Sequence, residues 1–267
     1  MNRIDNVFVK KERKLFIAYL VCGDPDLNTT FKLMNNLVKS GVDIIELGMP
    51  FTDPIADGPI IQKSVERALR KKTSLINVLD LVKKFRKSNK ITPVVLMGYL
   101  NPIENLGYEK FATLSEKSQV DGVLIVDSPP EESECLEYAL SEKNIHSIYL
   151  ASPTTDKKRL KEISRKSSGY LYYVSLKGIT GSKINKVDDI SKKIKSIRNM
   201  SNKNLPIAVG FGIKDSVTAR KISRIADGII IGSSIVELIE ENLHNRDKMI
   251  SKINKFAANI SNALVRK

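Results

Sequence analysis

The chain has 267 residues, enough for one large domain or two small ones, and 42% of them are hydrophobic, which is sufficient for a sizeable core. Its net charge of +14 would allow binding to a nucleic acid or to an anionic membrane. However, the basic residues are scattered, tryptophan is absent and aromatic residues make up 6%. We therefore interpret the basic residues as part of a solvated surface. Residues 1–14 lack the apolar core of a secretory signal, and no apolar run approaches the roughly 18 residues of a membrane helix. Cys22 and Cys135 fit no disulfide or metal spacing. We therefore expect a cytoplasmic protein with two buried thiols.

Eight short runs along the chain are continuously apolar and rich in isoleucine, valine and leucine. Such runs are typical of parallel strands that are covered on both faces. Longer segments with helical periodicity separate them, and each begins near a capping residue or a proline. The predicted strands are residues 15–21, 42–47, 93–97, 123–126, 147–150, 171–174, 206–209 and 228–231. The predicted helices are residues 27–40, 75–87, 104–117, 131–143, 156–167, 188–199, 215–225 and 247–265.

Three predicted strands are introduced by similar short turns that contain Asp43, Asp121 and Asp227. These turns indicate a faint internal repeat at a common end of the fold. No linker or composition break divides the chain, so we expect a single domain over residues 1–267. Eight βα units in one domain predict a closed (β/α)8 TIM barrel, with extra helices at the N-terminus and the C-terminus. The alternative is an open doubly wound sheet, which would usually carry a glycine fingerprint after its first strand, and residues 21–25 do not form one.

The segment from Glu46 to Pro59 (ELGMPFTDPIADGP) combines two acids with three prolines. An apolar strand ends near Glu46, and a restricted loop carries Asp57. In a barrel, the C-terminal ends of the strands carry the active site, and both acids occupy such a position. Two carboxylates in one partly apolar pocket can acquire different pKa values, so that one donates a proton while the other accepts one. A solvated turn is the simpler alternative, but it would not explain why an acid interrupts a buried run.

Glycine-containing loops follow the last three predicted strands, at residues 177–182, 210–213 and 232–234. Glycines let backbone N–H groups approach an anion, and a helix that starts at Ser233 would direct its positive end at the same point. The loops after strands seven and eight of such barrels are a recurrent phosphate site. Glycines also end strands in any α/β protein, but their presence after both of the last two strands favours a phosphate cradle.

These two constellations resemble the tryptophan synthase alpha subunit family. The resemblance covers nearly the whole chain, and the acidic segment is its most specific part. Other matching stretches are Gly23-Asp24-Pro25, Met97-Gly98-Tyr99-Leu100-Asn101-Pro102, Asp127-Ser128-Pro129-Pro130-Glu131-Glu132, Gly178-Ile179-Thr180-Gly181, Gly210-Phe211-Gly212-Ile213 and Gly232-Ser233. The resemblance implies aldol cleavage of indole-3-glycerol phosphate to indole and glyceraldehyde 3-phosphate, with no cofactor and no metal. It also implies a pyridoxal-phosphate beta subunit as the partner, in an α2β2 heterotetramer.

The resemblance also implies roles for individual residues. Glu46 matches the family's general acid/base, Asp57 the acid that interacts with the indole N–H, and Tyr172 an active-site tyrosine. The phosphate-binding positions match Gly181, Gly212, Gly232 and Ser233, the indole pocket matches Tyr99, Leu124 and Phe211, and the lid threonine matches Thr180. The chemistry suits these residue types, because carbon C3 of the indole must gain a proton, ring N1 must carry developing positive charge, and the C3′ hydroxyl must lose a proton.

The chain departs from the usual family pattern at Val126, Ser128 and Lys177, and at Val21-Cys22, without the loss of a catalytic group. Two alternatives remain. A Schiff-base aldolase would need a buried lysine at a strand end, and Lys177 is the candidate, which borohydride trapping with a triose phosphate would test. A non-catalytic barrel that binds and activates a beta subunit would not require both acids.

Overall fold

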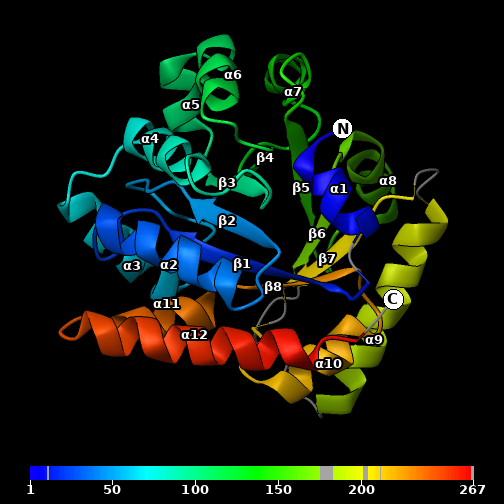
Figure 1. The fold of residues 1–267 in the computed structure, drawn as a ribbon. Coiled ribbons are helices and arrows are strands. Elements are labelled where there is room, and N and C mark those ends of the chain that lie inside the picture. The colour runs from blue at the N-terminus through cyan, green and yellow to red at the C-terminus, as the bar shows by residue number, and fades with distance from the viewer. Residues whose placement is uncertain (11, 175–182, 201–203, 211, 266–267) are drawn as a thin grey trace.

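The computed structural model describes residues 1–10, 12–174, 183–200, 204–210 and 212–265. Within these residues, eight parallel strands close into a barrel in chain order, β1 to β8, as Figure 1 shows. The strands are β1 Leu15–Val21, β2 Ile44–Gly48, β3 Val94–Gly98, β4 Gly122–Ile125, β5 His146–Ala151, β6 Leu171–Val174, β7 Ile207–Gly210 and β8 Gly228–Ile231. The prediction of a closed barrel is confirmed, and the open sheet is excluded because β8 pairs with β1. The assignment of the whole chain to one domain stays a prediction.

The strands are apolar throughout because both of their faces are buried. Alternate side chains point into the barrel, where Ile17, Ile44, Val95, Leu124 and Ile148 pack together. The intervening side chains form a larger cluster with the surrounding helices. Burial on both faces explains why the sequence shows continuous hydrophobic runs instead of a two-residue alternation.

The helices surround the barrel, and most of the predicted ones are present with shifted ends. The described helices are α1 Arg3–Lys10, α2 Leu27–Lys39, α3 Pro59–Arg70, α4 Leu75–Arg86, α5 Asn101–Leu106, α6 Tyr108–Lys117, α7 Glu134–Ser141, α8 Lys157–Lys166, α9 Lys183–Met200, α10 Ser216–Ser223, α11 Ser233–Glu240 and α12 Arg246–Ala263. Three differences from the prediction matter. The helix α3 was not expected, Gly107 at φ +88 divides residues 104–117 into α5 and α6, and α7 begins three residues later than expected.

The N-terminal helix α1 covers the end of the barrel at which the strands begin (Figure 1). Ile4 and Phe8 belong to the interior cluster, and the Phe8 ring lies 5.9 Å from the ring of Tyr170. The amide of Asn2 donates to the backbone oxygen of Asp121, which directly precedes β4. The helix therefore closes the end of the barrel that is opposite to the predicted active site.

The three aspartate turns identified in the sequence form a repeated contact at this same end. The amide of Phe16 donates to the carboxylate of Asp43 at 2.8 Å, Val94 donates to Asp121 at 2.8 Å, and Ile207 donates to Asp227 at 2.9 Å. In each case the aspartate amide donates back to the carbonyl of the same partner. Ser168 makes the equivalent pair of bonds with Ser147. These contacts join β1 to β2, β3 to β4, β5 to β6 and β7 to β8, so the repeat has a period of two βα units.

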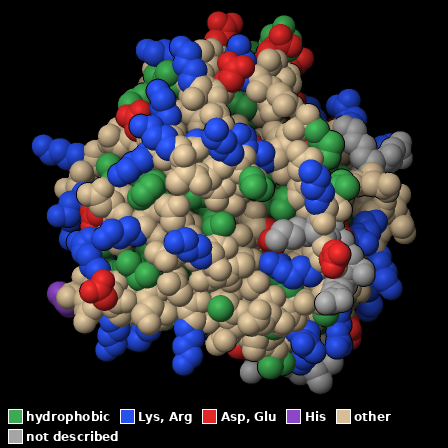
Figure 2. All heavy atoms as spheres, viewed as in Figure 1, with side chains coloured by type: hydrophobic (Ala, Val, Ile, Leu, Met, Phe, Trp, Pro, Cys, Tyr) green, Lys and Arg blue, Asp and Glu red, His purple; other side chains and the backbone are tan. Residues whose placement is uncertain are grey.

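The expectations about the basic surface, membrane helices and buried cysteines can be compared with the structure. Figure 2 shows lysine and arginine side chains spread over the visible face, as expected for a solvated surface. No helix in the described part of the chain is long and apolar enough to cross a membrane. Cys22 is buried as expected, whereas the expectation for Cys135 was wrong, because it lies on the exposed side of α7.

Candidate active site

Strand β2 carries Glu46 into the barrel interior, where its side chain is fully buried. The hydroxyl of Tyr170 donates a 2.6 Å hydrogen bond to Glu46 Oε1. Among the described residues, the second carboxylate oxygen, Oε2, has no hydrogen-bond partner. Burial raises the pKa of Glu46 from 4.5 to about 7, and the Tyr170 hydrogen bond opposes part of that rise. A carboxyl group in this state can both donate and accept a proton near neutral pH.

The loop between β2 and α3 carries Asp57, which is half-buried. Tyr99 Oη donates to Asp57 Oδ2 at 3.1 Å and accepts from the amide of Ala56 at 3.0 Å. The side chain of Gln62 donates to the backbone oxygen of Asp57 at 2.9 Å. Burial raises the pKa of Asp57, and the hydrogen bond from Tyr99 opposes the rise. The loop is therefore held in place by Tyr99, the residue directly after β3, and by Gln62 of α3.

Two further tyrosines lie near the carboxylates, and sequence reasoning identified only Tyr172. Tyr19 on β1 is paired in register with Glu46, and the charges of Asp57 and Glu46 add to the effect of burial in raising its pKa. Glycines make room for both rings. A Cβ atom at Gly48 would lie 2.4 Å from Tyr19 Oη, and one at Gly210 would lie 2.6 Å from Tyr172 Oη.

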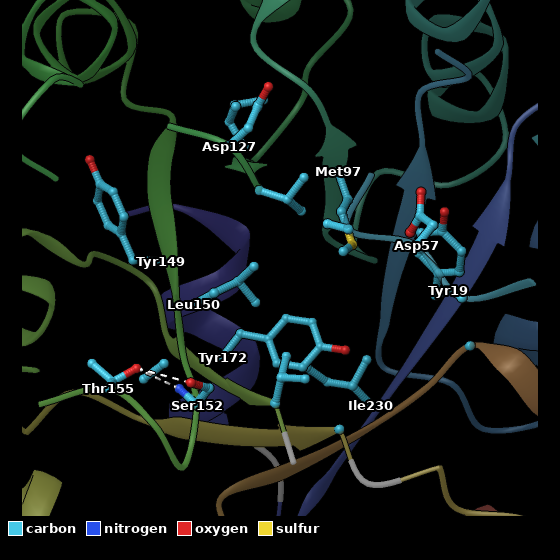
Figure 3. A pocket seen from close by; sticks show the side chains of 18 of the residues that line it. Tyr19, Asp57, Met97, Asp127, Tyr149, Leu150, Ser152, Thr155, Tyr172 and Ile230 are labelled. Carbon is cyan, nitrogen blue, oxygen red and sulfur yellow. Dashed lines mark hydrogen bonds between the residues drawn. The ribbon is translucent and has the colours of Figure 1, made fainter. Parts of the chain in front are cut away.

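A cavity of about 1000 Å³ opens beside these groups at the C-terminal ends of the strands. Figure 3 shows Asp57 and Tyr19 on one side, Tyr149 and Leu150 on the opposite side, and the Tyr172 ring between them. Of the predicted site residues, those that line the cavity are Asp57, Tyr172, Gly212, Gly232 and Ser233. The departures Val126 and Ser128 also line it. A mixed apolar and polar wall of this size suits a small-molecule ligand.

Other predicted residues lie behind the wall or outside the described residues. The carboxylate of Glu46 is directed towards Tyr170, beneath the cavity, and is not part of the wall as described. Tyr99 reaches the site through its hydrogen bond to Asp57. Leu124 is fully buried in the interior cluster, and Met97 and Val126 line the cavity in its neighbourhood. Thr180, Gly181, Phe211 and the departure Lys177 lie outside the described residues.

The loops after β7 and β8 meet at the predicted phosphate cradle. Gly212 has φ +58, a conformation that favours glycine, and Ser233 is the first residue of α11. Ser234 Oγ donates to the backbone oxygen of Ile213 at 2.7 Å and so ties the two loops together. The first N–H groups of a helix have no acceptors within that helix, so this end of α11 can receive an anion.

Fold and site together define a (β/α)8-barrel protein with an acidic pocket and a helix N-terminus at the C-terminal end of its strands. A sequence model of the family described as tryptophan synthase alpha chain matches residues 6–265. The tryptophan synthase alpha chain of Ruthia magnifica is 47% identical over 99% of this chain and 100% of the relative, and that of Neisseria meningitidis is 47% identical over 96% and 97%. A crystal structure of tryptophan synthase subunit alpha from Legionella pneumophila matches with a TM-score of 0.91 and 39% identity, covering 98% of each chain.

The chain therefore belongs to the tryptophan synthase alpha chain family. Members of this family are lyases that cleave indole-3-glycerol phosphate in tryptophan biosynthesis.

Proposed function

We propose that this chain cleaves indole-3-glycerol phosphate with Glu46 and Asp57 as its two acid–base groups and with Tyr172 in the active site. The observation that carries the proposal is the pair of carboxylates, Glu46 within β2 and Asp57 in the loop after it, both with raised pKa values, beneath and beside the cavity. The two carboxyl groups have different surroundings, because Glu46 is fully buried and Asp57 is half-buried at the cavity wall. Such a difference lets one group donate a proton while the other stays ionised.

The cleavage is a retro-aldol step in which two protons move. An acid protonates carbon C3 of the indole ring, which leaves positive charge on N1. A base then removes the proton of the C3′ hydroxyl, the C3–C3′ bond breaks, and its electron pair returns to the ring while C3′ becomes an aldehyde. We assign both transfers to Glu46, whose pKa of about 7 suits a group that gives and takes a proton in one cycle.

Asp57 is placed to stabilise the ring nitrogen. It lines the cavity, and its Oδ2 is held by the hydroxyl of Tyr99. A carboxylate close to N1 stabilises the positive charge that develops when C3 is protonated. The Tyr172 hydroxyl points into the same space, where it can hydrogen-bond to substrate oxygens.

The proposed position of the substrate phosphate is at the loops that follow β7 and β8, in the wall of the cavity. We assign it to Gly212, Gly232 and Ser233, supported by the free N-terminal end of α11. Gly181 and Thr180 complete the phosphate and lid positions, and Phe211, with Tyr99 and Leu124, completes the indole pocket. These last assignments follow from the family resemblance.

The proposed partner is a tryptophan synthase beta subunit in an α2β2 heterotetramer, with residues 53–58 and 101–105 as contact regions. Ile55 supports the first region, because this apolar side chain is 84% exposed at the tip of the acidic loop. We also propose that the chain works in the cytoplasm, since it carries two cysteines and both are free thiols.

The test is indole release from indole-3-glycerol phosphate by the purified chain, with and without a beta subunit. Wild-type protein should release indole, and more of it when the beta subunit is present. Glu46→Gln should lower cleavage by a factor of about 100 or more and leave partner binding intact. Glu66→Gln, an exposed substitution on α3, is the control and should change neither. Activity in Glu46→Gln equal to wild type would refute the assignment, and partner activation without any cleavage would favour the non-catalytic subunit.

A further inference from the structure

The loop after β1 carries an aspartate that the proposed chemistry does not use. The side chain of Asp24 is fully buried and accepts two hydrogen bonds from Arg67, from Nε to Oδ1 at 2.7 Å and from Nη2 to Oδ2 at 2.8 Å. The hydroxyl of Ser64 also donates to Asp24 Oδ2. Both donors belong to α3, so one carboxylate holds this helix at two positions that lie on the same face.

Helix α3 is the element on which the Asp57 loop rests. Asp57 is followed by Gly58, the N-cap, and by Pro59, the first residue of the helix. One turn further on, Gln62 returns its side chain to the backbone oxygen of Asp57. A shift or rotation of α3 would therefore move Asp57 relative to the cavity. Because the Asp24 contacts hold the helix immediately beyond Gln62, they limit both movements.

Arg67 also connects α3 to α11, the helix that begins at the predicted phosphate cradle. Its Nη1 lies 4.0 Å from Glu240 Oε1, and Lys63 Nζ lies 3.3 Å from the same oxygen. Glu240 is the last residue of α11, whose first residue is Ser233. The ionic contacts therefore link the helix that follows Asp57 with the helix that begins at the phosphate cradle.

Stability alone explains this arrangement poorly. Burying an ion pair costs desolvation energy that well-packed apolar residues would avoid, so such a pair is weak evidence for a stabilising role. A bidentate guanidinium–carboxylate contact instead fixes distance and orientation. Apolar packing of α3 is already supplied by Ile61, Val65 and Ala68, which lie against Tyr19 and Val21.

We propose that Asp24 and Arg67 are positioning residues that hold α3 so that Asp57 meets the indole ring nitrogen in the reactive geometry. The proposal rests on the proposed function for the role of Asp57, but the mechanical link from Asp24 to the acidic loop does not. Misplacement of a catalytic group by about 1 Å can cost up to roughly a hundredfold in rate, so a small movement of the helix would be visible in kcat.

The test compares Arg67→Lys with Arg13→Lys in the full chain. Arg13 is a close match, because it also binds a buried aspartate, Asp43, through two nitrogens, and its side chain is 21% exposed against 17% for Arg67. The Arg13 pair lies at the other end of the barrel. Lysine keeps the charge in both cases but loses the bidentate contact. Amide hydrogen exchange over residues 53–62 and the kinetics of indole release are measured for each, after both have been matched for unfolding free energy by choice of temperature.

We expect Arg67→Lys to exchange faster over residues 53–62 and to lower kcat about tenfold with little change in KM, whereas Arg13→Lys changes neither. Asp24→Asn, which keeps the shape of the side chain, should behave as Arg67→Lys and serves if the lysine variant does not fold. Unchanged exchange over residues 53–62 in the Arg67 and Asp24 variants would overturn the proposal, as would equal losses of kcat in Arg67→Lys and Arg13→Lys. If wild-type protein releases no indole, the proposed function fails, and the exchange comparison still decides the positioning role.

Discussion

Tyr170 and Glu46 form a fully buried pair, in which the tyrosine hydroxyl donates a 2.6 Å hydrogen bond to Glu46 Oε1. The pair joins residues 124 positions apart and connects the proposed acid–base group to the closed end of the barrel, where Phe8 of α1 packs on the Tyr170 ring. Glu46 therefore lies beneath the cavity with one oxygen hydrogen-bonded and the other without a partner among the residues that the structure describes.

The first prediction concerns the stability of the protein as a function of pH. Because burial raises the pKa of Glu46 from 4.5 to about 7, the folded state binds more protons than the unfolded state between these values. The free energy of unfolding should therefore fall as pH rises from 4.5 to 7, by roughly 3 kcal/mol in total, at about 1.4 kcal/mol per pH unit. Urea unfolding of wild type and Glu46→Gln at several pH values measures the difference. A stability difference between the two proteins that does not change with pH would contradict the prediction.

The second prediction concerns the hydroxyl of Tyr170. Its hydrogen bond favours the ionised carboxylate and so opposes the rise in the pKa of Glu46. Tyr170→Phe should raise the pKa of Glu46 further, so that the loss of stability with rising pH extends to higher pH, and it should lower the free energy of unfolding by about 1–3 kcal/mol. Tyr173→Phe is the control, because Tyr173 lies on β6, which begins directly after Tyr170, but packs in the outer cluster. Coincident pH profiles for wild type and Tyr170→Phe would refute the role of the hydrogen bond.

Sequence patterns anticipated the barrel because eight apolar strands and their helices are local features. The patterns did not reveal α3, because three prolines and two aspartates made the acidic segment resemble a loop. A usable signal was present, since Pro59 stands at a first helical position and is followed by Ile61, Val65 and Ala68 at helical spacing. The inward direction of Tyr19 could not be seen in a run that is buried on both faces. The contact between Glu46 and Tyr170 depends on strand register across the barrel, which a single sequence does not encode locally.

The third prediction tests the phosphate cradle. Ser233 lines the cavity at the first position of α11, where a carboxylate would repel a phosphate group that the helix end otherwise attracts. Ser233→Asp should raise KM for indole-3-glycerol phosphate about tenfold or more, and inorganic phosphate should inhibit the wild type much more strongly than the variant. Ser216→Asp provides the control at the first position of α10, whose residues do not line the cavity. Equal KM values for wild type and Ser233→Asp would place the phosphate elsewhere.

The fourth prediction separates stability from activity. Asp121 accepts hydrogen bonds from Arg86 Nη2 at 2.6 Å, from Arg3 Nη1 at 2.9 Å and from the amide of Val94 at 2.8 Å, at the end of the barrel remote from the cavity. Asp121→Ala would leave Arg86, whose side chain is 3% exposed, as an uncompensated buried charge, so it should lower the free energy of unfolding by about 3–5 kcal/mol.

Glu66 offers the contrast, because its pair with Arg70 is 62% and 78% exposed, and Glu66→Ala should cost less than about 1 kcal/mol. Denaturant unfolding and indole release are measured on both variants at a temperature at which both are folded. Activity per folded molecule should equal that of wild type, since Asp121 acts at the closed end of the barrel and touches neither carboxylate. A stability loss in Asp121→Ala no larger than that in Glu66→Ala would show that Arg86 finds another partner or reaches water when the carboxylate is removed.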